Sequence, residues 1–334
     1  MHGRFTIEGF GRHVPDRVLT NAELETIVDT SDDWITTRTG IKERHIAAPG
    51  EASSDLAVKA ATKALAYAGR EASDLTHLFY ATFTPDAFCP PASCILQEKL
   101  GIQGRACVDM NAACSGFLYG IETAMGALAL RPGSTVLVTA SEITTSRTNW
   151  ADRATCVLFG DGAGSVVISD REPKPGQAII KDIILKADGS LWPLLTVKGG
   201  GSGWPLKLGD TIKDDFFIEM NGPEVYKNAV RSMGSVCEEI VAKNGLAMDD
   251  IDLFIPHQAN TRIVDAVLPR LGIARERTFM NIEHYGNTSA ASIPIALAEA
   301  EESGRIADGD LVLLTGFGTG MTCTSALLRW GRPA

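Results

Sequence analysis

The sequence predicts an α/β protein whose chain consists of two similar halves, residues 1–172 and 173–334. Apolar, β-rich runs alternate with Ala-rich helical patterns in each half, which is typical of βαβ units with buried sheets. A weak duplication, at a shift of about 172 to 176 residues, indicates two copies of one unit. The polar segment 172–176 lies between the copies and is expected to link them. The aligned segments are Gly133–Thr139 with Gly309–Thr315, Ala66–Gly69 with Ala242–Gly245, and Leu78–Tyr80 with Leu253–Ile255.

The composition favours a cytoplasmic enzyme. The chain has 334 residues, 45% of them hydrophobic, and a net charge of −10, a balance that disfavours nucleic acid as a partner. No apolar stretch approaches the ~20 residues that cross a bilayer, so no membrane partner is expected, and the first residues lack the apolar core of a secretory signal. Seven cysteines without a CxxC pair predict free thiols in a reducing compartment and no metal site.

Cys114 is the cysteine best placed for chemistry. A β-like run passes through small residues into a helical pattern that begins near this position. Unpaired backbone N–H groups and the helix dipole favour a thiolate at such a start, and a thiolate attacks acyl groups. The alternative for any single cysteine is a small buried hydrophobic residue. The apolar face of the expected helix is formed by Leu118, Ile121, Met125 and Leu128.

His257 and Asn287 are the second and third candidate catalytic residues. Asn287 follows the run that corresponds to the one before Cys114, and it also opens an Ala-rich helix. Pseudo-twofold packing would therefore bring two helix starts to one site, which His257 could face from the end of strand 252–256. Alone, either residue is more simply a hydrogen-bonded structural residue or a cap. Cys, His and Asn also act together in papain-like proteases, but the Cys-Trp neighbourhood of those enzymes is absent here.

The glycine-rich motif Phe159–Gly164 invites a nucleotide-binding interpretation. The segment follows a strand-like run, but Val166, Val167 and Ile168 continue it as β structure. A dinucleotide fingerprint requires a helix at that point, so a tight turn in a core sheet is the better interpretation.

Five motifs together resemble the β-ketoacyl-acyl carrier protein synthase III family, over nearly the whole chain. The resemblance implies a thiolase-like fold with an αβαβα layered core, no resident cofactor, and the catalytic set Cys114, His257 and Asn287. Related thiolases and elongating synthases have Cys or His in place of the Asn, which separates this branch from them. The motifs are Thr30–Ile41, Ala112–Gly116, Phe159–Gly164, Pro256–Asn260 and Gly286–Ala290.

The resemblance implies a decarboxylative Claisen condensation that initiates fatty acid synthesis. Cys114 would take a short acyl group, expected to be acetyl, from coenzyme A, and malonyl-acyl carrier protein would lose carbon dioxide to give an enolate. Two neutral donors, His257 and the Asn287 amide, suit the stabilisation of that charge. The backbone N–H groups of Cys114 and Thr319 would hold the acyl oxyanion.

The resemblance also assigns the two substrates to particular residues. Coenzyme A would contact Trp34, Arg38, Arg153, Tyr226 and Asn260, with Trp34 and Arg153 stacking on the adenine. Core packing for Trp34 and solvated surface charge for the cations are the simpler alternatives. The acyl carrier protein would dock on Lys227, Gln258, Ala259, Asn260, Thr261, Arg262 and Arg270.

The acyl pocket and the assembly follow from the same resemblance. The wall of the pocket would consist of Thr144, Phe159, Ile218 and Phe317, with Phe88 supplied across a homodimer interface. Thr144 is polar where the family usually has an apolar residue, and Thr319 and Cys323 also depart from its pattern. The run Gly199–Gly203 is expected to be a surface excursion, either a flap near the site or a plain loop.

Two other functions stay open at this level. A relative in secondary metabolism that condenses or transfers an unusual acyl group would share the fold and the catalytic residues. A cysteine hydrolase, from another class, would share the nucleophile alone.

Overall fold

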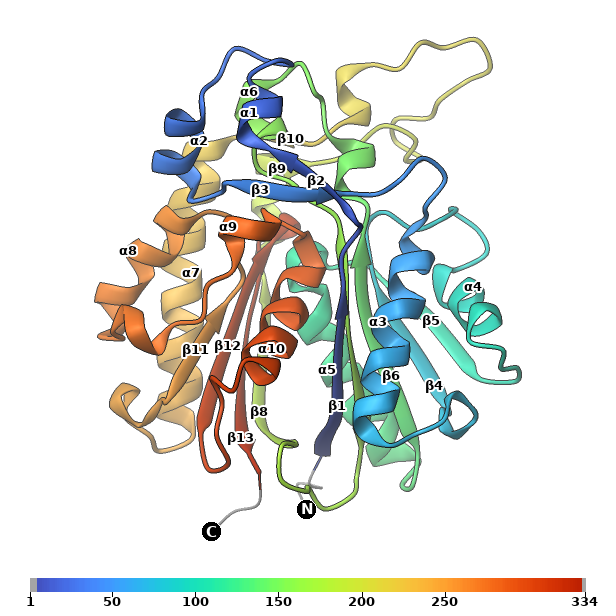
Figure 1. Ribbon diagram of the computed structural model, residues 1–334, viewed down its shortest axis with the longest axis vertical. Helices are drawn as coiled ribbons and strands as arrows, with labels where there is room; N and C mark the ends of the chain where they lie inside the picture. The colour runs from blue at the N-terminus through green and yellow to red at the C-terminus, as the bar shows by residue number, and fades with distance from the viewer. Residues whose placement is uncertain (1–4, 332–334) are drawn as a thin grey trace.

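The computed structural model describes residues 5–331 and has a large sheet with helices on and between its faces (Figure 1). Nine strands are hydrogen-bonded in the order β11-β12-β13-β8-β1-β7-β6-β4-β5. We call β1, β7, β6, β4 and β5 the first wing, and β8, β13, β12 and β11 the second wing. Their bounds are β1 Phe5–His13, β4 His77–Ala81, β5 Ala106–Met110, β6 Thr135–Glu142, β7 Gly162–Ser169, β8 Ala178–Ala187, β11 Leu253–Pro256, β12 Leu311–Gly318 and β13 Thr322–Trp330.

The two wings repeat one topology, as the duplication predicts. In the first wing β1 pairs with β7, and β6 and β4 follow. In the second wing β8 pairs with β13, and β12 and β11 follow in the same way. At the position in the second wing that corresponds to β5, the structure has a single parallel bridge between Phe254 and Thr278 in place of a strand. Where two separate sheets were expected, three residue pairs between β1 and β8, from Phe5↔Ile180 to Ile7↔Ala178, join the wings into one sheet.

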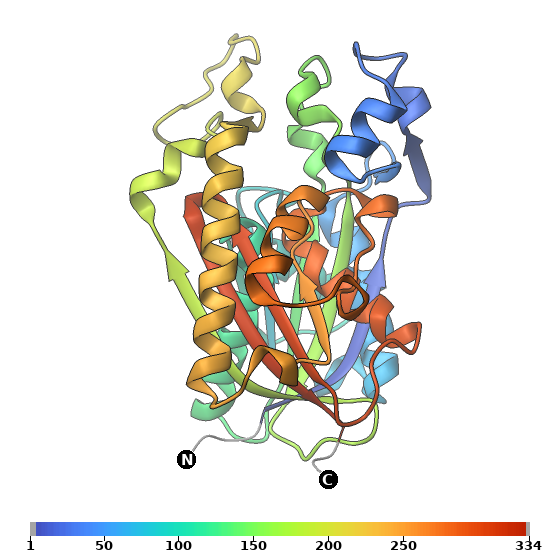
Figure 2. The same cartoon turned by 90° about the vertical axis from the view of Figure 1, so that its left-hand side faces the viewer.

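The helices form three layers around the wings, so the predicted α/β class with five layers is confirmed. Helices α3 and α4 cover the outer face of the first wing, and α7 and α8 cover that of the second wing, with α7 in the foreground of Figure 2. Helices α5 and α10 lie between the wings and contribute to the largest apolar core. The bounds are α3 Ser53–Ala68, α4 Ala92–Lys99, α5 Gly116–Leu130, α7 Gly222–Lys243, α8 Thr261–Leu271 and α10 Ser292–Glu302.

One helical segment, Ala113–Leu130, is long and apolar enough to cross a membrane by length and composition. This differs from the expectation that no stretch approaches that length. Half of the segment is buried, and α5 contacts β4 and β6 on one side and β8 and β13 on the other. Its apolar character is therefore that of a central core helix.

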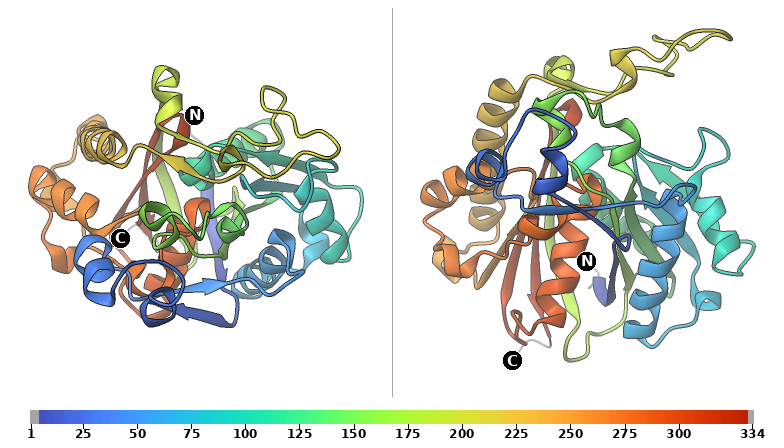
Figure 3. Two further views of the ribbon diagram at one scale, coloured as in Figure 1. Left: turned by 90° about the horizontal axis from the view of Figure 1, so that it is seen from above. Right: turned by 45° about the horizontal axis from the view of Figure 1, so that its top comes forward.

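Smaller elements gather at one end of the sheet, at the top of Figure 1 and facing the viewer in the left view of Figure 3. The segment 199–213 extends from this end as a long excursion, drawn in yellow. The small strands and helices are β2 Arg17–Thr20, α1 Asn21–Leu24, α2 Asp32–Thr39, β3 Glu43–Ile46, α6 Arg153–Cys156, β9 Leu195–Thr196, β10 Glu219–Met220 and α9 Ile282–Tyr285. The short 3-10 turns are η1 Ala72–Asp74, η2 Ala113–Ser115, η3 Thr144–Arg147, η4 Gly189–Leu194, η5 Asp214–Phe216, η6 Met248–Asp250, η7 Arg275–Arg277, η8 Ser289–Ala291 and η9 Thr319–Met321.

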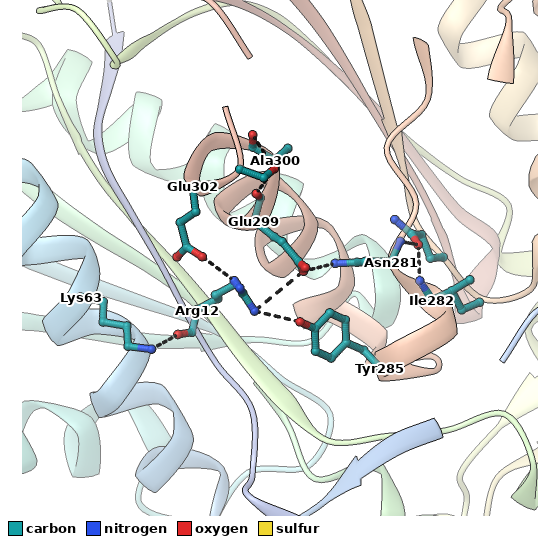
Figure 4. A network of polar contacts seen from close by, with 10 residues as sticks. Arg12, Lys63, Asn281, Ile282, Tyr285, Glu299, Ala300 and Glu302 are labelled. Carbon is teal, nitrogen blue, oxygen red and sulfur yellow. Dashed lines mark hydrogen bonds and ion pairs between the residues drawn. The ribbon is translucent and has the colours of Figure 1, made fainter. Parts of the chain in front are cut away.

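A polar network ties β1 to the helices of the second half (Figure 4). The Arg12 guanidinium donates to Glu302 at 2.9 Å and to the Tyr285 hydroxyl at 2.9 Å, and it lies 3.8 Å from Glu299. Lys63 of α3 donates to the Arg12 carbonyl at 3.0 Å. The network therefore connects an outer helix, a central strand and the central helix α10.

Close packing of β1 on α3 depends on glycine. A methyl group on Gly9 would lie 2.1 Å from the Ala64 carbonyl oxygen and 2.8 Å from the Ala68 Cβ. Because the first obstacle is helix backbone, Gly9→Ala should lower the free energy of unfolding by more than about 2 kcal/mol. Gly126→Ala is the matched control, since nothing lies within 4 Å of its added methyl; it should be neutral or stabilising. Urea unfolding of both variants checks this, and equal stabilities would contradict it.

Candidate active site

Cys114 lies at the start of the central helix, as the sequence predicts. The chain leaves β5, makes the turn η2 and enters α5 at Gly116. Ala113 has a positive φ of 45°, and its N–H donates to the Asn111 side chain at 3.2 Å. This turn leaves the Cys114 side chain facing a cavity while only 9% of the residue is exposed.

A turn of the same form carries Asn287 in the second half. Ser289 has a positive φ of 51°, and its N–H donates to the Asn287 Oδ1 atom at 2.9 Å. Each of the two asparagines therefore caps a turn whose third residue has a positive φ. The Asn287 backbone is fixed further by hydrogen bonds with Leu158 at 2.8 Å and Gly160 at 3.2 Å.

The structure brings Cys114, His257 and Asn287 onto one cavity of about 1100 Å³. His257 follows β11, and its N–H donates to the Thr315 carbonyl at 2.7 Å, which extends the pairing of β11 with β12. The cavity runs from these three residues to the end of the molecule where the smaller elements gather. A cavity with a nucleophile and two donor side chains suits acyl-transfer chemistry.

Burial fixes the protonation states in the site. His257 is 3% exposed, and both of its ring nitrogens lack a hydrogen-bond partner among residues 5–331. Burial lowers the pKa of His257 to about 4, so the ring is neutral at pH 7. Burial also raises the pKa of the Cys114 thiol to about 12. That direction opposes the sequence-based expectation of a thiolate, because desolvation outweighs the helix start.

The predicted oxyanion site lies beside the loop that follows β12. A methyl group on Gly318 would lie 2.9 Å from the Cys114 nitrogen, so the loop backbone approaches that N–H closely. Thr319 lines the cavity, and its hydroxyl donates to the Leu195 carbonyl. The Thr319 hydroxyl is thus used by Leu195, and the close approach to the Cys114 N–H is made by the backbone at Gly318, the last residue of β12.

The residues predicted for coenzyme A lie at the mouth of the cavity, where Trp34, Arg38, Tyr226 and Asn260 form part of its lining. The guanidinium groups of Arg38 and Arg153 lie 4.6 and 5.0 Å from the Trp34 ring centroid. Arg153 is not among the lining residues; it contacts Trp34 and donates to the Asp29 carbonyl at 2.9 Å.

The predicted carrier-protein residues divide into exposed and buried groups. Lys227 and Arg262 are exposed, and Arg262 also lies at the cavity mouth, 5.8 Å from the Tyr226 ring centroid. Arg270 is exposed but forms a two-pronged ion pair with Glu238 at 2.8 and 2.7 Å, which neutralises its charge locally. Ala259, Asn260 and Thr261 are half-buried, with the Thr261 hydroxyl donating to the Thr39 carbonyl at 2.9 Å.

Gln258 corrects one of these predictions. It is only 1% exposed, and its side-chain oxygen accepts from the N–H groups of Asn281 and Ile282, both at 2.8 Å. Its amide group donates to the Phe279 carbonyl at 3.1 Å. With its hydrogen bonds used inside the protein, Gln258 holds the segment after His257 in place and is not available to a docking partner.

Four of the five residues predicted for the acyl pocket lie on the cavity. Phe88, Phe159, Ile218 and Phe317 line the cavity. Thr144 does not: it is fully buried, and its hydroxyl donates to the Gly160 carbonyl at 2.7 Å. A polar side chain at this position satisfies a backbone carbonyl instead of forming an apolar wall.

Glu142 and Ser289 are polar groups near Cys114 to which the sequence analysis gave no role. The Cys114 thiol donates to the Ser289 hydroxyl at 3.5 Å, and that hydroxyl donates to Glu142 at 3.2 Å. The sequence did contain a signal: Glu142 directly follows the uncharged, β-rich run 135–141, and a carboxylate buried with such a strand needs internal partners.

Comparison with known proteins agrees with this geometry. Residues 108–189 match the family model of 3-oxoacyl-[acyl-carrier-protein] synthase III, and residues 241–330 match the model of its C-terminal part. Beta-ketoacyl-[acyl-carrier-protein] synthase III of Oleidesulfovibrio alaskensis is 53% identical over 97% of this chain and 98% of its own. The same-named protein of Nitratidesulfovibrio vulgaris is 54% identical over 97% and 98%.

Solved structures give the same result. The crystal structure of 3-oxoacyl-[acyl-carrier-protein] synthase III from Aquifex aeolicus has a TM-score of 0.89 at 43% identity, covering 98% of this chain and 100% of that one. The priming β-ketosynthase of the R1128 polyketide pathway has a TM-score of 0.88 at 32% identity, covering 99% and 98%. These matches confirm the thiolase-like fold that the motifs implied.

Proposed function

Because the chain belongs to the β-ketoacyl-acyl carrier protein synthase III family, we propose that it condenses an acyl primer with malonyl-acyl carrier protein and so initiates fatty acid synthesis. The primer is an acyl-coenzyme A, with acetyl-coenzyme A as the expected form. The observation that carries the proposal is the position of Cys114, His257 and Asn287 on one enclosed cavity. The reaction takes place in the cytoplasm.

In the first half-reaction Cys114 takes the acyl group from coenzyme A. The cationic and aromatic groups at the cavity mouth, Arg38 and Trp34, suit a ligand with phosphates and a flat base. The acyl chain then lies on the apolar wall that includes Phe159 and Phe317. The backbone N–H of Cys114, at the helix start, faces the developing oxyanion.

In the second half-reaction the malonyl group loses carbon dioxide and its enolate attacks the acyl-cysteine. A neutral His257 donates a hydrogen bond to the enolate oxygen without contributing a charge of its own. The Asn287 amide is the second donor, since its Oδ1 atom is occupied by Ser289 and its NH₂ group is left to face the cavity.

Two alternatives differ in what the structure offers them. A hydrolase requires a histidine that accepts the thiol proton, but the His257 nitrogens have no hydrogen-bond partner in the described part of the chain, and burial lowers the pKa of the ring to about 4. A role in secondary metabolism has one supporting observation, the 32% identity with a priming ketosynthase of a polyketide pathway. That role would keep the same reaction and change the primer.

The reaction is tested by following Cys114 directly. Incubation with acetyl-coenzyme A should add one acetyl group to the Cys114 peptide by mass spectrometry, and added malonyl-carrier protein should remove it as acetoacetyl-carrier protein. Cys114→Ala should lose the adduct, because the structure offers no other thiol beside His257 and Asn287 on this cavity among residues 5–331. An adduct on another cysteine, or release as free acetate alone, would contradict the proposal.

Docking of the carrier protein is expected to depend on Arg262, an exposed cation that forms no ion pair with the residues that the structure describes. Arg262→Ala should raise the KM for malonyl-carrier protein about tenfold and leave the KM for acetyl-coenzyme A within about twofold, since the carrier protein is acidic. Arg270→Ala is the matched control and should have a smaller effect, because Glu238 already neutralises Arg270. Steady-state kinetics at low and high salt measure both variants. Equal effects of the two would contradict this assignment.

A homodimer completes the pocket in this proposal. Phe88 is 81% exposed in the single chain although it lies at the cavity, which suits a side chain that a second subunit covers. Sedimentation should give about twice the chain mass of 35.6 kDa. Phe88→Ala should change the relative rates with short primers. Leu130→Ala is the control: its side chain is 84% exposed at the end of α5 far from Cys114, and its removal should leave these relative rates unchanged. A fully active monomer would contradict the arrangement.

A further inference from the structure

Glu142 is a carboxylate buried completely at the end of β6. Its Oε2 atom accepts hydrogen bonds from the hydroxyls of Thr82 at 2.9 Å and Thr84 at 2.6 Å, and from the Phe83 N–H at 3.1 Å. Within residues 5–331, no lysine or arginine forms an ion pair with it. Burying a carboxylate without a cation lowers the stability of the fold, so its position beside the active site indicates a functional role.

The second oxygen of this carboxylate is directed toward the nucleophile. Its Oε1 atom accepts from the Ser289 hydroxyl at 3.2 Å, and the Ser289 oxygen in turn accepts from the Cys114 thiol at 3.5 Å. Ser289 is held at this place by the positive-φ turn that Asn287 caps. The three groups therefore form a continuous hydrogen-bonded chain from sulfur to carboxylate, with every donor directed toward Glu142.

Acyl transfer requires an acceptor for the thiol proton. The thiol is protonated in the resting site, and it must lose its proton as the sulfur attacks the acyl carbon. His257 makes no hydrogen bond to the thiol and is a weak base in its buried setting. A proton acceptor other than His257 is therefore needed.

We propose that Glu142 accepts the Cys114 proton through the Ser289 hydroxyl during acyl transfer, and returns it to the departing thiolate of coenzyme A. This inference rests on the proposed acyl transfer and adds the route of its proton.

The steps balance in atoms and charge. As the bond from Cys114 sulfur to the acyl carbon forms, the thiol proton moves to the Ser289 oxygen and the Ser289 proton moves to Glu142 Oε1. As the bond from that carbon to the coenzyme A sulfur breaks, the departing thiolate takes the Ser289 proton and Glu142 returns its own. The products are acyl-Cys114, free coenzyme A thiol and the original carboxylate.

The acidity of Glu142 suits this role. Burial raises the pKa of Glu142 to about 7. At neutral pH a carboxyl group with this pKa is partly deprotonated, and it is a stronger proton acceptor than an ordinary carboxylate. β6 packs against β4, β7, α3, α5 and η8. The titratable groups that act on Glu142 from its surroundings are the Cys114 thiol from η2 and the Tyr80 hydroxyl from β4, both protonated at neutral pH. A transition near pH 7 in the reactivity of Cys114 is therefore expected to come from Glu142.

The test measures thiol reactivity, so it does not depend on the identity of the acyl substrates. The rate at which iodoacetamide alkylates Cys114, read from its peptide by mass spectrometry between pH 5 and 10, should rise through about pH 7 in the wild type and then level off. Glu142→Gln retains the shape of the side chain but cannot take a proton. It should lose that transition and react about 10²-fold more slowly at pH 8.

Three further variants separate the relay from a structural effect. Ser289→Ala should lose the transition as Glu142→Gln does, and the double variant should be no slower than either one, because the residues act as a unit. Asp161→Asn is the matched control: Asp161 is equally buried and accepts from the Thr145 hydroxyl at 2.6 Å, but it has no hydrogen bond to Ser289 or Cys114 among the described contacts. It should keep the wild-type pH profile. An unchanged transition in Glu142→Gln, or its loss in Asp161→Asn, would overturn the proposal even if acetyl transfer and condensation proceed as proposed.

Discussion

The close approach of two helix starts between the wings is the constraint on which the site depends. Turns η2 and η8 contact each other, and the central helices α5 and α10 continue from them. Gly116 makes this approach possible, since a methyl group there would lie 3.0 Å from the Ala81 Cβ and 3.6 Å from the Ala290 Cβ. Larger side chains at these three positions would separate the turns, and Cys114 would then lose contact with Ser289.

The duplication explains both the likeness of the two turns and their difference in chemistry. Positions 176 residues apart carry the same backbone form: 111 with 287, and 113 with 289. With the same shift of 176 residues, the position equivalent to Cys114 is Ala290, the one equivalent to His257 is Ala81, and the one equivalent to Glu142 is Gly318. Each half thus keeps a small residue where the other has a reactive one. The nucleophile and its proton acceptor come from the first half, and the two hydrogen-bond donors come from the second.

Patterns of polarity and duplication were sufficient to predict the fold class and the meeting of Cys114, His257 and Asn287. Local sequence could not show which polar side chains point inward. Gln258 stands in the same motif as His257, yet its partners Phe279, Asn281 and Ile282 come from a segment about twenty residues further along. The pairing of Arg270 with Glu238 and the burial of Thr144 also depend on distant segments. Such contacts are set by tertiary packing, which periodicity does not encode.

The low polarity of the cavity floor determines how the proposed chemistry divides among its groups. Desolvation disfavours every isolated charge, so His257 loses its proton readily while Cys114 keeps its own. A neutral imidazole serves a reaction that builds negative charge on a thioester oxygen, because it donates without first competing for the proton of the thiol. The same desolvation raises the pKa of Glu142 to about 7 instead of leaving it a weak base. One physical effect thus yields a donor at His257 and a base at Glu142, and Ser289 lies where the base can reach the nucleophile.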